Sequence, residues 1–281
     1  MNKWEVQELI FRALKEDVGH QDMTTANLIA QEQLGTAKLL AKASGILAGI
    51  EISQAVFSTL DSSISFEILK RDGEAIEAGD TIALVRGKIS TLLTGERLAL
   101  NFLQRLSGIA TKTNQMVEAI KYYKAEIVDT RKTTPGLRAL EKYAVRVGGG
   151  RNHRFGLYDG VMIKDNHIKA AGGITKAVIT LRKKVPHTLK IEVEVENLLQ
   201  LREALDAGVD IIMLDNMSIE DMKSAVEITA GKALLEASGG INESNLLEVA
   251  RTGVDFISIG AITHSVSSLD ISFDIIQVER A

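Results

Sequence analysis

Six short apolar segments, each followed by a stretch with helical periodicity, recur through the second half of this chain. Repeated pairs of a strand and a helix build parallel sheets with right-handed crossovers. Six strands are two fewer than a closed (β/α)₈ barrel contains. The pattern therefore predicts an α/β fold with an open, incomplete α/β barrel of about six parallel strands. The segments are EIVDT (126–130), GVMIK (160–164), KIEVEV (190–195), DIIMLD (210–215), ALLEAS (233–238) and DFISIG (255–260).

The first hundred residues follow another pattern, in which short β-rich segments at 36–50, 63–73 and 80–90 are separated by turn signals. We expect an N-terminal α/β sandwich domain over 1–110, an α/β barrel domain over 111–269, and a return of 270–281 to the first domain as a strand. Apolar spacing over 90–123 predicts a long helix that bridges the two domains. The first nineteen residues predict an amphipathic helix with Trp4, Ile10 and Leu14 on its apolar side.

Composition limits the class of protein. The 281 residues are 45% hydrophobic and 25% charged with a net charge of −4, which is typical of a soluble protein and argues against nucleic acid as the main partner. Cysteine is absent, so disulfides, thiolate nucleophiles and thiolate metal sites are excluded. Acidic residues interrupt the N-terminal segment too often for a signal peptide, and no apolar run reaches the length of about 18 residues that spans a bilayer. We expect a cytoplasmic protein.

Basic side chains gather between residues 129 and 168, where two predicted strands end. Cations at strand ends and among glycines indicate an anion-binding site, whereas a solvated basic face would show helical spacing. Because the whole chain is slightly acidic, we expect a small anion. The sequence assigns no role to His20, His167, His187 and His264. The cluster itself consists of Arg131, Lys132, His153, Arg154 and Lys164.

Carboxylates end two further predicted strands. Glu192 and Glu194 are two residues apart and share one face of a strand, and Asp215 ends the next one. Carboxylates that face each other need cations or a metal ion to offset their repulsion. Mg²⁺ held by Glu194 and Asp215 together with substrate oxygens would do so. A structural pairing of one glutamate with Lys164 or Lys132 is the alternative.

Glycine-rich turns follow the last two predicted strands. Ser238-Gly239-Gly240 comes directly after one strand and is expected to open a helix, and Gly260 begins the turn after the next strand. Exposed backbone amides at such positions bind phosphate in barrel enzymes. The two turns together predict a phosphate-binding site.

These residues stand in long segments that resemble the quinolinate phosphoribosyltransferase family, over essentially the whole chain. The resemblance implies an N-terminal α/β sandwich followed by an open α/β barrel, and a pentosyltransferase activity in NAD biosynthesis that joins quinolinate to phosphoribosyl pyrophosphate with loss of CO₂. The segments are GERLALNFLQRLSGIAT (95–111), the stretch 129–167, EVEVEN (192–197), MLDN (213–216), EASGGI (236–241) and IGAITHS (259–265).

The resemblance also implies roles for particular residues. Mg²⁺ would accompany phosphoribosyl pyrophosphate near Glu194 and Asp215. Arg97 would come from the partner subunit of a homodimer. Catalytic roles would fall to Lys132, Lys164, Glu194 and Asp215. Quinolinate would bind to Arg131, His153, Arg154 and Lys164 with Lys132 nearby, and the 5′-phosphate to Ser238, Gly239, Gly240 and Gly260.

Three other functions are compatible with the same residues. A related phosphoribosyltransferase could act on another acid, such as nicotinate or a substrate linked to molybdate-uptake gene clusters. Five or six basic side chains favour a substrate with two carboxylates over both of these alternative substrates. Lys164 at a strand end could instead form the Schiff base of an aldolase. A non-catalytic anion-binding module would bind such ligands without turnover.

Overall fold

The computed structural model describes residues 3–279, which form two compact units. The first unit contains the described residues up to Asn114, the segment Thr134–Gly149 and the C-terminal segment from Val266. The second contains Gln115–Thr133 and Gly150–Ser265. None of the described helices is long and apolar enough to cross a membrane.

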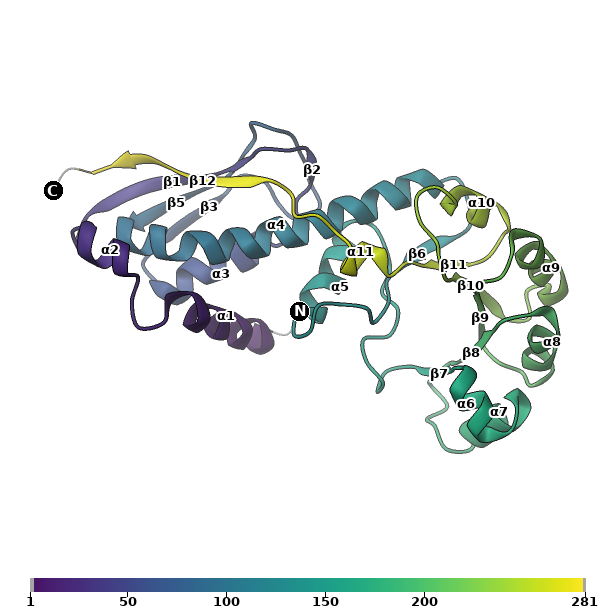
Figure 1. Ribbon diagram of the computed structural model, residues 1–281. Coiled ribbons are helices and arrows are strands. Elements are labelled where there is room, and N and C mark those ends of the chain that lie inside the picture. The colour runs from purple at the N-terminus through teal and green to yellow at the C-terminus, as the bar shows by residue number, and fades with distance from the viewer. Residues whose placement is uncertain (1–2, 280–281) are drawn as a thin grey trace. The chain divides into compact units, whose positions relative to one another are not determined.

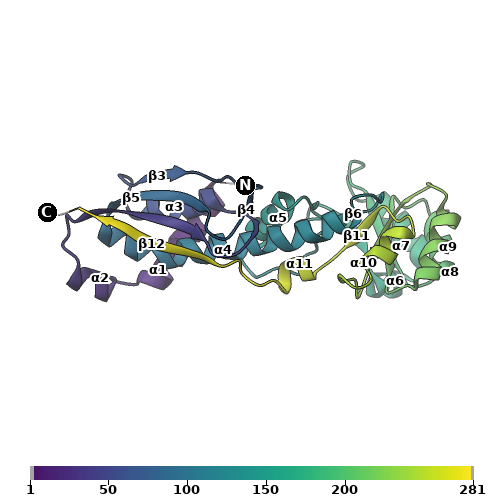
Figure 2. The same cartoon turned by 90° about the horizontal axis from the view of Figure 1, so that it is seen from above.

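A four-stranded antiparallel sheet organises the first unit, with the strand order β12-β1-β5-β3. Helices α3 and α4 lie along one face of this sheet (Figures 1 and 2), so the predicted α/β sandwich is confirmed. The C-terminal strand β12 pairs with β1 near the start of the chain. The strands are β1 (Leu34–Ala41), β3 (Ser65–Ile68), β5 (Thr81–Lys88) and β12 (Ile271–Val278), with a separate pair β2 (Gly45–Ile46) and β4 (Ala75–Ile76). The helices are α1 (Lys3–Val18), α2 (Met23–Leu28), α3 (Ile50–Leu60), most of the long α4 (Ile89–Ile120) and α5 (Arg138–Val147).

Aromatic packing fills the space between α3 and the sheet. Phe57 of α3 is fully buried and stacks on Phe273 of β12 at 5.5 Å between ring centroids, with Phe66 of β3 at 6.1 Å. Helix α1 packs on α3 and buries Ile10 and Leu14 as expected. Trp4, which was expected on the same apolar side, is 85% exposed.

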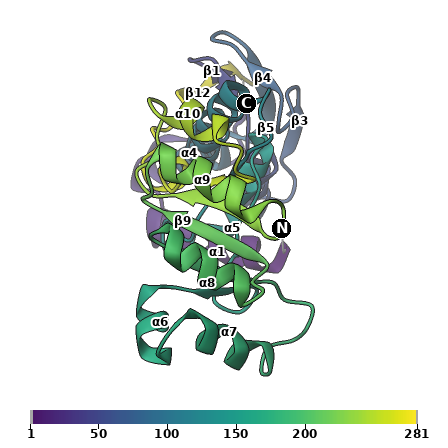
Figure 3. The same ribbon diagram turned by 90° about the vertical axis from the view of Figure 1, so that its right-hand side faces the viewer.

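The second unit is built on six parallel strands in the order β6-β11-β10-β9-β8-β7. Helices α6 to α10 follow one another along one side of this curved sheet (Figures 1 and 3), which confirms the open α/β barrel. The edge strands β6 and β7 do not pair with each other, so the barrel is not closed. The strands are β6 (Glu126–Val128), β7 (Val161–Ile163), β8 (Ile191–Val195), β9 (Ile211–Asp215), β10 (Leu234–Ser238) and β11 (Phe256–Ser258). The helices are α6 (Asp165–Ala171), α7 (Ile174–Arg182), α8 (Leu198–Asp206), α9 (Ile219–Thr229), α10 (Leu246–Arg251) and α11 (Ala261–His264).

Local signals fix where several strands stop. Valine and isoleucine dominate β8, and such β-branched residues suit a buried strand. Asn197 then accepts hydrogen bonds from the backbone N–H groups of Leu199 and Gln200 and starts α8. Ser218 caps α9 after β9 in the same way. Helices α8 and α9 therefore begin within four residues of the ends of β8 and β9.

Replacement of Phe57 by alanine is expected to destabilise the first unit by about 3–5 kcal/mol, because it removes a fully buried ring and leaves a cavity. Urea unfolding followed by circular dichroism measures this loss. Phe11→Ala is the matched control, since Phe11 is 63% exposed and its loss should change the unfolding free energy by less than about 0.5 kcal/mol. Equal effects of the two changes would contradict the proposed role of the aromatic core.

Candidate active site

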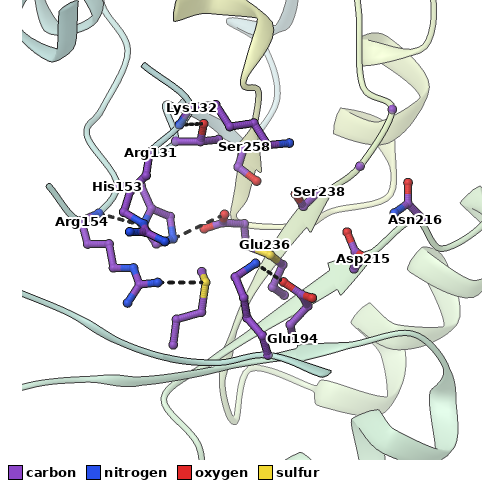
Figure 4. Close-up of a pocket in the computed structure, with 16 residues that line it drawn as sticks. Arg131, Lys132, His153, Arg154, Glu194, Asp215, Asn216, Glu236, Ser238 and Ser258 are labelled. Carbon is purple, nitrogen blue, oxygen red and sulfur yellow. Dashed lines mark hydrogen bonds and ion pairs between the residues drawn. The ribbon is translucent and has the colours of Figure 1, made fainter. Parts of the chain in front are cut away.

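A cavity of about 490 Å³ opens at the carboxyl ends of the parallel strands in the second unit. Figure 4 shows arginine and histidine side chains on one side of it, Asp215 and Asn216 on the other, and Glu236 between them. Most of the predicted site residues meet here, although they come from strands and loops far apart in the sequence. The predicted residues that line the cavity are Arg131, Lys132, His153, Arg154, Lys164, Glu194, Asp215, Ser238, Gly239 and Gly240.

Two predicted residues are not among those that line the cavity. Gly260 lies just beside it, because a β-carbon at this position would be 3.1 Å from Cδ of Lys132. Arg97 lies on α4 in the first unit, where its side chain is 60% exposed and its guanidinium is 3.8 Å from the carboxylate of Glu96.

Strand register brings the acidic side of the cavity together. Glu236 of β10 pairs with Met213 of β9, and Met213 pairs with Glu194 of β8, so the three residues form one row across the sheet. Ser238 and Asp215 form the next row toward the carboxyl edge. Neighbours within these rows are 19 or 23 positions apart in sequence, and strand pairing brings them together.

Arg154 is held with part of its guanidinium available. Its Nη1 donates to the carbonyl of Gly160 at 2.9 Å and its Nη2 contacts the sulfur of Met162, but its buried Nε has no hydrogen-bond acceptor. Burial lowers the pKa of Arg154, and the nearby charge of Arg131 lowers it further. Two neighbouring cations that line one cavity are well suited to bind a carboxylate or a phosphate.

Lys164 and Glu194 form an ion pair of 2.7 Å at the mouth of the cavity. The pairing expected as the structural alternative is therefore present, although both residues also line the cavity. Lys132 is anchored through its carbonyl, which accepts a 2.8 Å hydrogen bond from Oγ1 of Thr263. Arg131 and Arg154 thus lie on one side of the cavity and Asp215 on the other, while Lys164 and Glu194 are paired directly with each other.

The loop after β10 has the open backbone expected of an anion site. Gly239 and Gly240 have φ values of +93° and +63°, and residues other than glycine rarely adopt such positive values. Asn216 also has positive φ, and its N–H donates to the carbonyl of Ser238 at 2.9 Å. The expected helix does not start here, because α10 begins only at Leu246. The available amides therefore belong to a loop rather than to a helix N-terminus.

Below this loop lies a buried cluster that the sequence prediction missed in part. Nε2 of His153 is 3.1 Å from Glu192 and 3.7 Å from Glu236, and both carboxylates are almost completely buried. Burial and the neighbouring Glu192 raise the pKa of Glu236 to about 7. Glu236 could have been found from sequence, because it is two residues before Ser238 on the same strand and shares its face. Asn216, Ser258, Met162 and Met213 also line the cavity and were not predicted.

Two other histidines have local structural contacts. Nδ1 of His167 accepts a hydrogen bond from the N–H of Lys164 and so caps the start of α6. Nδ1 of His264 lies 2.7 Å from Oγ of Ser265. Neither contact requires a ligand.

Comparison with known proteins covers both units. The family model for the quinolinate phosphoribosyl transferase N-terminal domain matches residues 22–107, and the model for the C-terminal domain of the same family matches 109–274. A Bacillus subtilis protein named as a probable nicotinate-nucleotide pyrophosphorylase (carboxylating) is 47% identical over 98% of this chain and 95% of its own length. A protein of the same name from Methanocaldococcus jannaschii is 44% identical over 97% and 98%. The solved structure of the nicotinate-nucleotide pyrophosphorylase from Francisella tularensis is similar with a TM-score of 0.94, 43% identity, and coverage of 98% and 97%.

Substitution of alanine for Gly239 is expected to disturb the loop after β10, because the new β-carbon would overlap the Asn216 side chain in addition to straining the backbone. Gly240→Ala is the control, since it has positive φ but no atom within 4 Å of the added carbon. We expect Gly239→Ala to lower the unfolding free energy by about 2 kcal/mol and Gly240→Ala by about 1 kcal/mol. Thermal unfolding and calorimetric titration with inorganic phosphate measure the two effects. Stronger phosphate binding by Gly239→Ala would contradict the assigned role of this loop.

Proposed function

Because the chain belongs to the quinolinate phosphoribosyl transferase family, we propose that it transfers phosphoribose from phosphoribosyl pyrophosphate to quinolinate in NAD biosynthesis. The products are nicotinate mononucleotide, pyrophosphate and CO₂. The observation that carries this proposal is one cavity that combines a cationic surface, carboxylates and a glycine loop. The cations would bind the dianion quinolinate, the glycine loop would bind the phosphate of the sugar, and the carboxylates would stabilise positive charge on the ribose.

Quinolinate would bind on the cationic side of the cavity. Arg131, Arg154 and Lys164 supply positive charge for its two carboxylates, with His153 and Lys132 beside them. Arg154 lies near Arg131 in this cavity, and two neighbouring positive charges favour a ligand with more than one carboxylate. A substrate with a single carboxylate, such as nicotinate, would leave part of the cationic surface uncompensated.

Phosphoribosyl pyrophosphate would bind on the opposite side. Its 5′-phosphate would lie against Ser238, Gly239 and Gly240, with Gly260 adjacent. Glu194 and Asp215 are oxygen donors of the kind that Mg²⁺ prefers, so the residues present fit this ion. Mg²⁺ bound there together with substrate oxygens would neutralise charge on the departing pyrophosphate.

The side chains then have separate tasks in the reaction. As pyrophosphate leaves, positive charge develops at C1 of the ribose, where the carboxylates of Glu194 and Asp215 would stabilise it. The ring nitrogen of quinolinate forms the new bond to C1, and this makes the ring a pyridinium. The C–C bond to the adjacent carboxylate then breaks, CO₂ leaves, and the electron pair stays on the ring carbon until a proton replaces the lost group.

The ion pair of Lys164 disfavours the Schiff-base alternative. An imine requires a neutral amine, whereas Nζ of Lys164 lies 2.7 Å from the carboxylate of Glu194 as a cation. Alternative substrates within the family are likewise not favoured, because the named relatives that match this chain are nicotinate-nucleotide pyrophosphorylases. The cytoplasmic location stays a prediction from the sequence.

Purified protein mixed with quinolinate, phosphoribosyl pyrophosphate and Mg²⁺ is expected to release CO₂ and pyrophosphate in equal amounts. Both substrates should be required, and turnover should stop after EDTA treatment and return when Mg²⁺ is added. Isotope-labelled carboxylate and a coupled pyrophosphate assay measure the two products. Equal rates with nicotinate would exclude the dianion assignment, and turnover in metal-free protein would exclude the metal.

Replacement of Arg154 by alanine should weaken quinolinate binding by about 100-fold or more, because it removes a guanidinium group that can bind a carboxylate through two N–H donors. Binding of phosphoribosyl pyrophosphate should stay largely intact. Asp215→Asn is the contrasting variant. It keeps the size of the side chain but removes its charge, so it should lower kcat more than quinolinate affinity. Calorimetry with each substrate and steady-state kinetics separate the effects. Equal loss of quinolinate affinity in both variants would show that the two surfaces are not divided as proposed.

We also propose that the protein is a homodimer in which Arg97 serves the active site of the partner subunit. The side chain of Arg97 is 60% exposed, and its guanidinium lies 3.8 Å from the carboxylate of the adjacent residue Glu96. Its guanidinium is therefore accessible to a ligand held by a second chain. A two-fold dimer would place each Arg97 at the other subunit's cavity by symmetry.

Mixing Arg97→Ala and Lys164→Ala proteins tests this arrangement. If each variant alone is nearly inactive, random exchange makes about half of the dimers hybrid, and each hybrid has one intact site if Arg97 acts across the dimer. Activity should then recover to roughly a quarter of wild type. Mass spectrometry verifies subunit exchange. Recovery that stays at the background of the single variants would place Arg97 in its own chain's site or in a structural role.

A further inference from the structure

A buried group of three side chains separates two cavities inside the second unit. His153 and Glu236 line the cavity at the carboxyl ends of the strands and also a second cavity of about 810 Å³. The second cavity is lined by residues at the first positions of the strands, including Ile211, Leu234 and Phe256, so it opens at the opposite end of the sheet. Glu192 completes the group between the two openings.

The hydrogen bonds of His153 determine its protonation. Its Nδ1 accepts the backbone N–H of Arg154 at 2.7 Å, so the ring proton is on Nε2. Nε2 faces Glu192 at 3.1 Å and Glu236 at 3.7 Å. The single N–H at Nε2 is therefore directed at two carboxylates.

The two carboxylates remain incompletely satisfied. One buried oxygen of Glu192 and one of Glu236 accept no hydrogen bond. Paired buried carboxylates with an unsatisfied oxygen on each are expensive to keep fully ionised. A proton on Glu236 would remove one negative charge and supply a donor for these oxygens.

A metal ion is the other species that could occupy such a group, since the three possible ligand atoms lie within 4.8 Å of one another. A metal bound to Nε2 would require the ring proton to move to Nδ1. The N–H of Arg154 already points at Nδ1, so two hydrogens would face each other. The hydrogen-bond pattern therefore favours a proton over a metal.

The groups that face Glu236 set when it binds this proton. Glu192 of β8 and Asp129 directly after β6 add negative charge, while His153 and the hydroxyl of Ser258 on β11 partly offset it. Burial has the largest effect, and together these influences raise the pKa of Glu236 to about 7. The proton is thus bound below this pH and is lost as the pH rises through it.

We propose that Glu236 takes up a proton when quinolinate binds and donates it to the ring carbon that loses CO₂. This inference rests on the proposed function. A dianion that enters a cavity lined by Glu236 disfavours the ionised carboxylate, so substrate binding and proton binding assist each other. The proton loaded with the substrate is the one that the reaction consumes.

The transfer balances without any redox partner. The C–C bond to the carboxylate breaks and leaves its electron pair on the ring carbon, which forms a C–H bond with the proton of the Glu236 carboxyl group. Glu236 becomes a carboxylate, with Glu192 and His153 still in place beside it. Solvent protons restore it from the second cavity, which Glu236 also lines.

Proton uptake on quinolinate binding tests the first step directly in the wild-type protein. Calorimetric titrations of EDTA-treated protein in two buffers with different ionisation enthalpies should give about half a proton or more taken up per site at pH 8, and less at pH 6. Quinolinate affinity should be nearly constant below pH 7 and fall by up to about tenfold per pH unit above it. Absence of uptake at pH 8 in protein that turns over quinolinate would overturn the proposal, whereas absence of turnover in the wild type would instead refute the proposed function.

Glu236→Gln, which keeps the size of the side chain but cannot supply the proton, tests the second step. It should abolish proton uptake, bind quinolinate at least as tightly as wild type because a buried negative charge is gone, and lower kcat by about 100-fold or more. Glu227→Gln on the exposed surface of α9 is the matched control and should behave as wild type. Uptake that persists in Glu236→Gln would assign the proton to His153, and an unchanged kcat would exclude Glu236 as the donor. Either result would overturn the proposal.

Discussion

The parallel arrangement of six strands is the constraint on which the site depends. Parallel strands end at one edge of a sheet, so many polar residues at the strand ends gather around one cavity. Register adds a second level of order, because Glu194, Met213 and Glu236 form one row and Asp215 and Ser238 the next. Acidic residues from three strands thus meet without any local signal that relates one strand to another.

Charge compensation explains how so many ionisable groups share this edge. The carboxylates come from the strands, whereas most of the cations come from the loops that follow β6 and precede β7. Lys164 pairs with Glu194 at 2.7 Å, whereas the deeper Glu192 and Glu236 share the Nε2 atom of His153. The arginine and lysine side chains that line the cavity are therefore suited to bind substrate anions, and the buried pair of Glu192 and Glu236 is suited to bind a proton.

Because the barrel is open, the buried group of His153, Glu192 and Glu236 can be reached from both ends of the sheet. The edge strands β6 and β7 are not joined, and two cavities approach the His153 group from opposite ends of the sheet. In a closed, tightly filled barrel the interior layers of side chains would block the second approach. Incomplete closure of the barrel thus leaves the second cavity through which Glu236 can exchange a proton with solvent.

The sequence by itself determined the six strands, the long helix and most of the cavity residues, because strand ends and glycine turns leave local patterns. It could not determine which strand-end residues become neighbours, since register and closure depend on packing across the whole sheet. Strand periodicity alone could have placed Glu236 on the face of Ser238, but its closeness to Glu192 and His153 required the tertiary structure. The loop after Gly240 was misjudged because Asn242 and Asn245 bind backbone N–H groups there and hold a turn, so α10 starts late. The role of His153 likewise required the tertiary structure, because only folding brings two buried carboxylates to one ring nitrogen.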